Sequence, residues 1–179
     1  MEWWSKEESK KKDFFSTSPL FHHPITPSPH HSTSPIQLAL EQARNAAIAG
    51  EVPIGAAIVQ HDRVIAAAHN LTETQNDPTA HAELLAIRCA CEILGTPRLV
   101  DCDLYVTLEP CAMCAQAISF ARIRRLYFGA YDPKGGGVEH GARIFSQPTC
   151  HHKPEVYGGI SESECGEMLR TFFAARRAT

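Results

Sequence analysis

Two short stretches decide the fold: residues 77–83 read Asp-Pro-Thr-Ala-His-Ala-Glu, and residues 110–114 read Pro-Cys-Ala-Met-Cys. They bring together one imidazole, from His81, and two thiols, from Cys111 and Cys114. These groups are common zinc ligands, and three protein ligands leave the fourth tetrahedral position open for water, as in catalytic zinc sites. We therefore expect His81, Cys111 and Cys114 to bind one Zn²⁺, with Glu83 acting as the acid/base and not as a ligand.

The spacing of these residues predicts their local structure. The two cysteines are three residues apart, so they share one face of the helix predicted for residues 112–120. The strand predicted for residues 103–108 ends just before them, which places both thiolates at a helix start, where free N–H groups favour anions. His81 and Glu83 are two residues apart and can converge on one ion only at the start of another helix. The sequence thus predicts two helix N-termini facing each other across the metal.

Two other interpretations of the cysteines explain less. A redox-active C-x-x-C pair would leave the upstream His-Ala-Glu unexplained. A structural zinc would need a fourth ligand, and none of the remaining cysteines is spaced like a second ligand pair: Cys89, Cys91, Cys102, Cys150 and Cys165. The order H-x-E and then P-C-x-x-C is the signature of zinc-dependent nucleobase deaminases.

Composition limits the class of protein. The chain has 179 residues, 44% of them hydrophobic and 21% charged, which suits one globular domain. No apolar run approaches the ~20 residues of a membrane span, and the N-terminus has no apolar core of a signal peptide. The cysteine count of 7 is odd and lacks regular spacing, which favours a reducing, cytoplasmic location over a disulfide scaffold. A net charge of −3 argues against a general nucleic-acid coat, but residues 112–179 carry 9 Lys and Arg against 6 Asp and Glu.

The chain divides at Ser34. Residues 1–34 are rich in Ser, Pro, Thr and His, a composition that cannot build a core, so we predict a disordered extension. Residues 35–179 then form the zinc-dependent deaminase domain. It begins with a helix at Ser34-Pro35 that ends near Gly50, and its last helix opens with a capping box of Ser161 and Glu164.

Strands and helices alternate after an initial hairpin. Besides the strand before the cysteines, we expect strands over residues 54–60, 64–68, 125–130 and 157–160, the first two joined by a turn at residues 61–63. This order predicts an α/β three-layer fold with a mixed five-stranded sheet flanked by helices.

Flanking stretches extend the motif to a known family. From about Ile36 to Arg177 the chain resembles the bacterial tRNA-specific adenosine deaminases of the cytidine deaminase superfamily. The matching stretches are Val52-Pro53-Ile54-Gly55, His69-Asn70, residues 77–83, Tyr105-Val106-Thr107-Leu108-Glu109-Pro110-Cys111, Phe128-Gly129-Ala130 with Asp132, and Phe172-Phe173. The resemblance implies the cytidine-deaminase fold, a homodimer, one zinc per subunit, and conversion of the wobble adenosine of a tRNA anticodon stem-loop to inosine. The extension at residues 1–34 and Pro133 depart from the family pattern.

The same resemblance implies roles for two further residues. Asn70 would hydrogen-bond the flipped base, and Asp132 would line the nucleotide channel near the flanking ribose. The plainer alternatives are that Asn70 only forms a turn and that Asp132 with Pro133 only opens a loop. In the implied reaction, Glu83 takes a proton from the zinc-bound water that attacks C6 of adenine, passes it to N1, and helps ammonia leave. A base in a single-stranded loop costs less to flip than one in a duplex.

The last predicted helix has two faces. A buried face would carry Cys165, Met168, Leu169 and Phe172. A second face carries Arg170, Phe173 and Arg177, and basic groups around an exposed aromatic ring suit an RNA backbone with a stackable base. The alternative is a solvated end of the helix, where arginines complement the dipole.

Four other functions remain open at this point. A free-base guanine deaminase could share the zinc motif and needs no phosphate-binding surface. A riboflavin-pathway deaminase fits the cysteine spacing poorly, and a cytidine deaminase usually has Cys at the position of His81. A zinc-stabilised RNA-binding module without activity would not need Glu83. Incubation with a stem-loop, guanine and cytidine separates these functions by their products.

Overall fold

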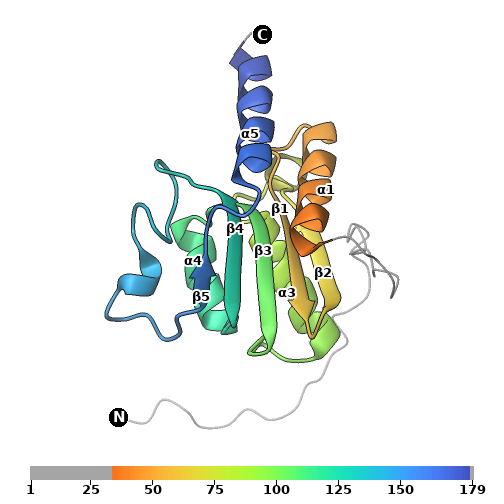
Figure 1. Cartoon of the computed structure of the whole chain (residues 1–179). Helices are drawn as coiled ribbons and strands as arrows, with labels where there is room; N and C mark the ends of the chain where they lie inside the picture. The colour runs from red at the N-terminus through yellow and green to blue at the C-terminus, as the bar shows by residue number, and fades with distance from the viewer. Residues whose placement is uncertain (1–33, 178–179) are drawn as a thin grey trace, which may run out of the picture.

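A mixed five-stranded sheet lies at the centre of the structure, a computed structural model that describes residues 34–177 (Figure 1). The strand order is β2-β1-β3-β4-β5; β1 is antiparallel to β2 and β3, and β3, β4 and β5 are mutually parallel. The strands are β1 (Gly55–Gln60), β2 (Arg63–His69), β3 (Cys102–Leu108), β4 (Arg125–Ala130) and β5 (Glu155–Tyr157).

Helices cover both faces of this sheet. Figure 1 shows α1 and α5 in front of the sheet and α3 and α4 behind it. The helices are α1 (Pro35–Ile48), α2 (Thr72–Gln75), α3 (Ala82–Leu94), α4 (Ala112–Ala121) and α5 (Glu162–Arg177), with a short 3₁₀ helix, η1 (Ile144–Ser146), in the loop before β5. The α/β class, the three layers and the mixed five-stranded sheet expected from the sequence are confirmed.

The main core lies between the sheet and the pair α3 and α4. Side chains of β1, β3 and β4 alternate between the faces, and those on this face are fully buried, among them Ile58, Leu104, Leu126 and Phe128. Burial on this scale stabilises by about 25 cal/mol per Å² of apolar surface, which holds the strands in one register. A smaller cluster of Leu40, Ala130 and Cys165 joins α1 and α5 to the other face.

The β1–β2 hairpin closes through a tight turn at His61 and Asp62. His61 and Asp62 have φ of 47° and 63°, the left-handed pair of a two-residue hairpin turn whose twist matches the strands. This tight turn brings the end of β2 back beside the start of β1. Asn70, the residue after β2, therefore donates its N–H to the Ile54 carbonyl at 3.1 Å.

Two local predictions were wrong. The last strand is Glu155–Tyr157 and not residues 157–160, because Gly158 approaches Phe128 so closely that a Cβ would lie 2.5 Å from its ring, and Gly159 turns the chain with φ of 80°. The capping box does not form: Ser161 has φ of 54°, and Glu164 accepts hydrogen bonds from Arg44 and Gln37 of α1 instead.

The predicted disorder of the N-terminal extension concerns residues 1–33, which lie outside the described residues, and Ser34, which precedes α1. Within residues 34–177, no helix combines the length and the apolar character that a membrane crossing requires.

Candidate active site

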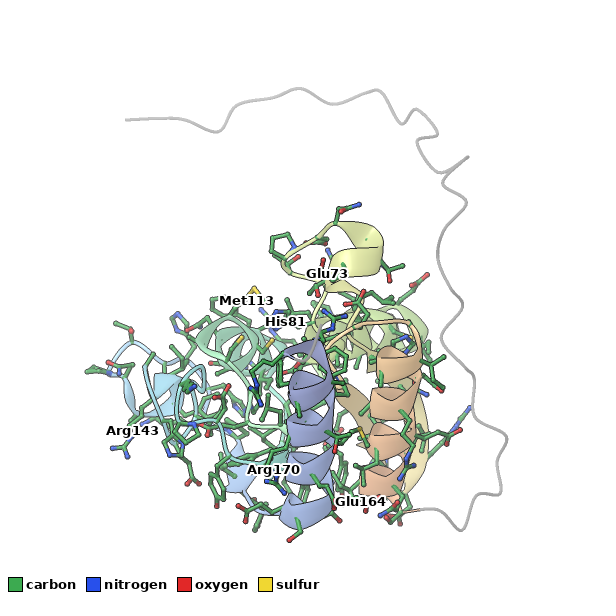
Figure 2. All side chains as sticks on the ribbon, turned by 90° about the horizontal axis from the view of Figure 1, so that it is seen from above. Glu73, His81, Met113, Arg143, Glu164 and Arg170 are labelled. Atoms are coloured by element: carbon green, nitrogen blue, oxygen red, sulfur yellow. The ribbon has the colours of Figure 1, made fainter. Side chains whose placement is uncertain are left out.

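Two helix N-termini meet behind the carboxyl end of β3 and bring the predicted ligands together. His81 is the N-cap residue of α3 and Cys111 that of α4, and both have extended backbone with ψ of 148° and 171°. Cys114 lies in the first turn of α4 and is fully buried. Figure 2 labels His81, at the start of α3, and Met113, which lies between the two cysteines in the first turn of α4. The predicted arrangement of two facing helix starts is confirmed.

The three ligand atoms have the spacing that zinc requires. His81 Nδ1 lies 3.7 Å from Cys111 Sγ and 3.5 Å from Cys114 Sγ. A tetrahedral ion with bonds of about 2.0 Å to nitrogen and about 2.3 Å to sulfur would separate these atoms by about 3.5 Å. Among the residues that the structure describes, this is the group of three His, Cys, Asp or Glu side chains whose ligand atoms lie within 4.8 Å of one another. The residues present therefore fit a zinc ion.

The protonation of the two thiols also fits a cation. The hydrogen bond with Cys114, helped by His81, lowers the pKa of Cys111 to about 4. The same hydrogen bond and burial raise the pKa of Cys114, and the contact with Cys111 raises the pKa of His81. The two thiols thus share one proton, as like acids in one site do. A bound dication would displace that proton, because zinc binds thiolates.

Glu83 lies in the first turn of α3 and only 4% of it is exposed. Burial raises the pKa of its carboxyl from 4.5 to about 7, in spite of a hydrogen bond from its own backbone N–H. It is not a member of the three-residue cluster. A carboxyl group beside a metal site with a pKa near neutrality can both accept and return a proton, which is the property of a general acid/base.

Asn70 is buried beside the start of α3. Its side-chain Oδ1 accepts a hydrogen bond of 2.9 Å from the backbone N–H of Ala82, the residue between His81 and Glu83. This bond satisfies one of the free N–H groups at the helix start and fixes the orientation of the Asn70 amide. The contact of Asn70 with a base stays a prediction, but the structure places its side chain at the start of α3, the helix that carries Glu83.

Asp132 begins a loop that returns to the metal cluster. Its Oδ1 accepts hydrogen bonds of 3.0 Å from the N–H groups of both Lys134 and Gly135, a turn stabilised by an aspartate side chain. Four residues further on, Gly136 forms an isolated β-bridge with Cys111. The loop therefore passes directly over one metal ligand, and Asp132 lies half-buried at its start. Its contact with a ribose stays a prediction.

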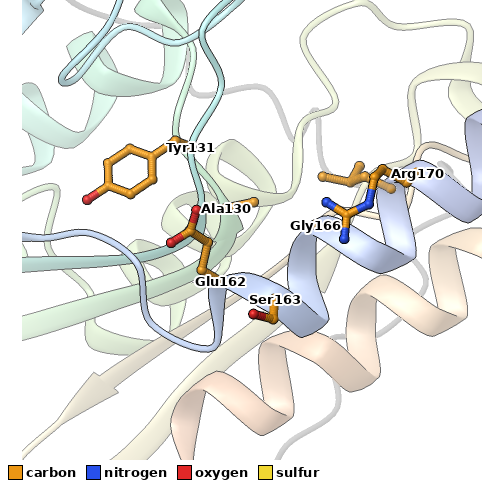
Figure 3. A pocket seen from close by; sticks show the side chains of 7 residues that line it. Ala130, Tyr131, Glu162, Ser163, Gly166 and Arg170 are labelled. Atoms are coloured by element: carbon orange, nitrogen blue, oxygen red, sulfur yellow. The ribbon is translucent and has the colours of Figure 1, made fainter.

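A cavity of about 480 Å³ lies beside the end of β4 and the first turns of α5 (Figure 3). Arg170 reaches it by folding back over Gly166, where Nη1 lies 3.0 Å from the position of a Cβ. The lining residues are Ala130, Tyr131, Glu162, Ser163, Gly166, Leu169 and Arg170. Because Tyr131 precedes Asp132, Arg170 lies on the side of the molecule where the loop over the metal cluster begins.

The other predicted α5 residues do not line this cavity. Phe173 is 43% exposed, and Arg177 is exposed near the end of the helix. Arg176 lies 4.5 Å from the Phe172 ring centroid and donates to the Gly50 carbonyl, so it joins α5 to the end of α1. The predicted buried face of α5 is mostly half-buried, with Cys165 as its fully packed member.

Two buried carboxylates, Glu109 and Glu51, are not among the residues predicted from the sequence. Glu109 follows β3 and accepts hydrogen bonds from the loop that starts at Asp132. Glu51 accepts from the Thr72 hydroxyl and from the N–H groups of Glu73 and Thr74 at 3.1, 3.2 and 2.7 Å, and so anchors α2. In the sequence, each of these residues is a charged residue at the end of a predicted helix or apolar strand. Its hydrogen-bond partners lie more than 20 residues away in the sequence, so their positions could not be predicted.

Known proteins resemble this chain in sequence and in fold. The family model for MafB19-like deaminases matches residues 31–177. A tRNA-specific adenosine deaminase of Agrobacterium fabrum is 63% identical over 142 residues, which cover 79% of this chain and 93% of that protein. A structure from studies of A-to-I editing by tRNA:A34 deaminases at the wobble position is 64% identical, with a TM-score of 0.74, and covers 75% of this chain and 98% of that one. A guanine deaminase of Bacillus subtilis is 34% identical, with a TM-score of 0.55, and covers 80% and 92%.

Proposed function

Because the chain belongs to the family of tRNA-specific adenosine deaminases, we propose that it hydrolyses adenosine to inosine at the wobble position of a tRNA anticodon. The protein is an enzyme of the deaminase class. One observation of the structure carries the proposal: His81, Cys111 and Cys114 have the spacing of zinc ligands, and a buried carboxyl group, Glu83, lies beside them without joining them.

The proposed cofactor is one zinc ion per subunit, held by His81, Cys111 and Cys114. When bound, zinc would act as a Lewis acid and acidify water in its open position. Glu83 accepts a proton from the attacking water and delivers it to N1 of the ring. It then assists transfer of a proton to the departing amino group, so that water and adenosine become inosine and ammonia.

Asn70 and the start of α3 form the proposed base-binding edge. Because Asn70 Oδ1 is committed to the Ala82 N–H, its amide NH₂ group points its donors elsewhere and can bind an acceptor on the flipped base. A purine that enters such a site must leave its stack, at a cost of a few kcal/mol that is lowest for an unpaired loop base. This favours an anticodon loop over duplex nucleic acid as the substrate.

The proposed RNA-binding surface combines Asp132 with Arg170, Phe173 and Arg177 of α5. Asp132 would contact the ribose next to the flipped base, and the arginines would bind backbone phosphates. Phe173, as an exposed ring, would stack on a loop base. Figure 1 supports this use of α5, because the helix continues past the edge of the sheet at which α3 and α4 begin.

We also propose a homodimer formed through α3 and α4. The outer surface of these helices carries a groove of about 340 Å³, and Phe120, at the end of α4, is 55% exposed. The groove is lined by Thr79, Leu84, Ile87, Arg88, Cys91, Pro97, Arg98, Ala117, Phe120 and Ala121. A second copy on this face would cover the large exposed ring of Phe120, at the opposite end of α4 from Cys111. The proposed location is the cytoplasm, which suits free cysteines.

A product assay tests the function. The purified protein is incubated with an anticodon stem-loop that carries adenosine at the wobble position, with the same stem-loop carrying guanosine there, with free guanine and with cytidine. We expect inosine from the first substrate only, and none from a Glu83→Ala variant. Xanthine from free guanine without inosine would assign the protein to guanine deamination instead.

A further inference from the structure

Glu109 is a buried carboxylate with five hydrogen bonds to one loop. Its side chain is fully buried, directly after β3 and two residues before Cys111. Oε1 accepts from the backbone N–H groups of Val138, Glu139 and His140 at 3.3, 2.9 and 2.9 Å. Oε2 accepts from the Asp132 N–H at 3.1 Å and bonds His140 Nδ1 at 2.7 Å. One side chain thus binds both ends of the loop over residues 132–140.

The loop also contacts the start of α4 directly. The N–H of Gly137 donates to the Pro110 carbonyl at 2.8 Å, and Gly136 pairs with Cys111. Neither glycine leaves room for a side chain: a Cβ at Gly136 would lie 2.6 Å from Glu109 Oε1, and one at Gly137 would lie 2.4 Å from the Ala112 nitrogen. The backbone of the loop therefore packs against the Glu109 carboxylate and the start of α4 at once.

Removing the carboxylate would release the loop and leave its donors unpaired. Four backbone N–H groups would lose their acceptor, and Gly136, Gly137 and Val138 are buried, so water does not reach the loop freely. Hydrogen bonds to charged groups contribute more to stability than bonds between neutral groups. The start of the loop, at Asp132, and its end, at His140, are both bound by this one group.

We infer that Glu109 is a positioning residue, whose carboxylate closes residues 132–140 into a fixed loop that covers Cys111 and holds Asp132 beside the site. Glu109 contacts neither the substrate nor the ligand atoms, and acts through the loop. The inference rests on the proposed function only for the identity of the substrate that Asp132 contacts. The binding of the loop by Glu109 and the contact of the loop with Cys111 do not depend on the proposed function.

The test compares Glu109→Gln with wild type. The amide has the same shape but offers one acceptor oxygen, and its NH₂ group would face either the Asp132 N–H or the N–H groups of residues 138–140, which are also donors. We expect amide hydrogen exchange across residues 136–140 to accelerate about tenfold or more. Zinc should still bind one per subunit but pass to a chelator several-fold faster, and KM for the stem-loop should rise about tenfold with a smaller change in kcat.

Two further variants separate positioning from general stability. Gly136→Ala leaves the carboxylate in place but puts a methyl group against Oε1, so it should show the same faster exchange and zinc release. Asp103→Asn removes another buried carboxylate, bound to Arg124 Nε and Nη2 at 2.9 Å each near the opposite end of β3. It should lower the melting temperature without affecting exchange over residues 136–140, zinc release or KM.

The inference is overturned if Glu109→Gln melts at a lower temperature but keeps wild-type exchange in the loop and wild-type zinc release, because Glu109 is then only structural. It is also overturned if Asp103→Asn reproduces every effect of Glu109→Gln. If wild type itself produces no inosine, the proposed function is wrong, and the exchange and zinc-release measurements still decide the role of Glu109.

Discussion

Replacing Glu83 by Gln separates proton transfer from metal binding. The change keeps the shape of a side chain that is 4% exposed and removes its ability to take a proton. Loss of general acid–base catalysis slows reactions roughly 100- to 10,000-fold. The buried carboxylate of Glu109, two residues before Cys111, is already bound to four backbone amides, so it is not free to replace Glu83. We therefore expect the upper end of the range, about 10,000-fold, or about 5.4 kcal/mol at about 1.36 kcal/mol per tenfold.

The assay measures single-turnover inosine formation and zinc content on the same preparations. Glu83→Gln should retain one zinc per subunit, whereas Cys111→Ser, Cys114→Ser and His81→Ala should lose zinc and melt at a lower temperature. Glu92→Gln, an exposed change on the same helix, is the matched control and should behave like wild type. A zinc-free Glu83→Gln protein would refute the assignment, because Glu83 would then be a ligand. Turnover within tenfold of wild type would refute its role as the acid/base.

Three further predictions concern the RNA-binding surface, the extension and the response to acid. The double variant Arg170→Glu with Arg177→Glu should weaken stem-loop binding and reduce its salt dependence by about one unit of slope per lost phosphate contact, with zinc content unchanged. Arg63→Glu, in the β1–β2 hairpin, is the control. If the double variant deaminates the stem-loop as well as wild type at low and moderate salt, this surface does not bind the RNA. Deletion of residues 1–34 should leave zinc content, melting temperature and activity nearly unchanged, and a loss of several degrees would show that the extension packs on the domain. Hydrogen bonds from Thr74, Glu73 and Thr72 outweigh the effect of burial and hold the pKa of Glu51 below 4.5. The stability that this carboxylate contributes is therefore present above the unfolded pKa near 4.5 and is lost as the pH falls through the lower folded pKa. Urea titrations in that acidic range should show wild type losing more stability than Glu51→Gln, and an equal loss in both proteins would contradict the role of the carboxylate.

The metal cluster could be predicted from the sequence because its geometry is local. The spacing of Cys111 and Cys114 is one helical turn, and a helix start is the place where His81 and Glu83 can converge. An apolar strand before the cysteines and helical periodicity after Glu83 then determine on which side of the sheet the two pieces meet. The same local signals predicted β4 at its observed bounds, residues 125–130.

Prediction failed where a long-range contact competed with a local preference. Ser161 and Glu164 have the spacing of a capping box, but a salt bridge of 2.8 Å between Glu164 and Arg44 takes the glutamate to α1. The last strand moved because Phe128, in the core, leaves room only for glycine at position 158. In both cases the deciding atoms are at least 30 residues away in the sequence.

The sequence by itself determined the chemistry of this protein: one imidazole, two thiols and one carboxyl group, at spacings that converge on a single ion. The tertiary structure decided how that chemistry is supported. Glu109 holds the loop over Cys111, Asn70 binds the start of α3, and Arg176 joins α5 to the end of α1. The residues next to each of these side chains in the sequence do not indicate whether it is bonded or faces solvent. A hydrogen bond needs its partner within about 3 Å, and only the folded chain brings those partners together.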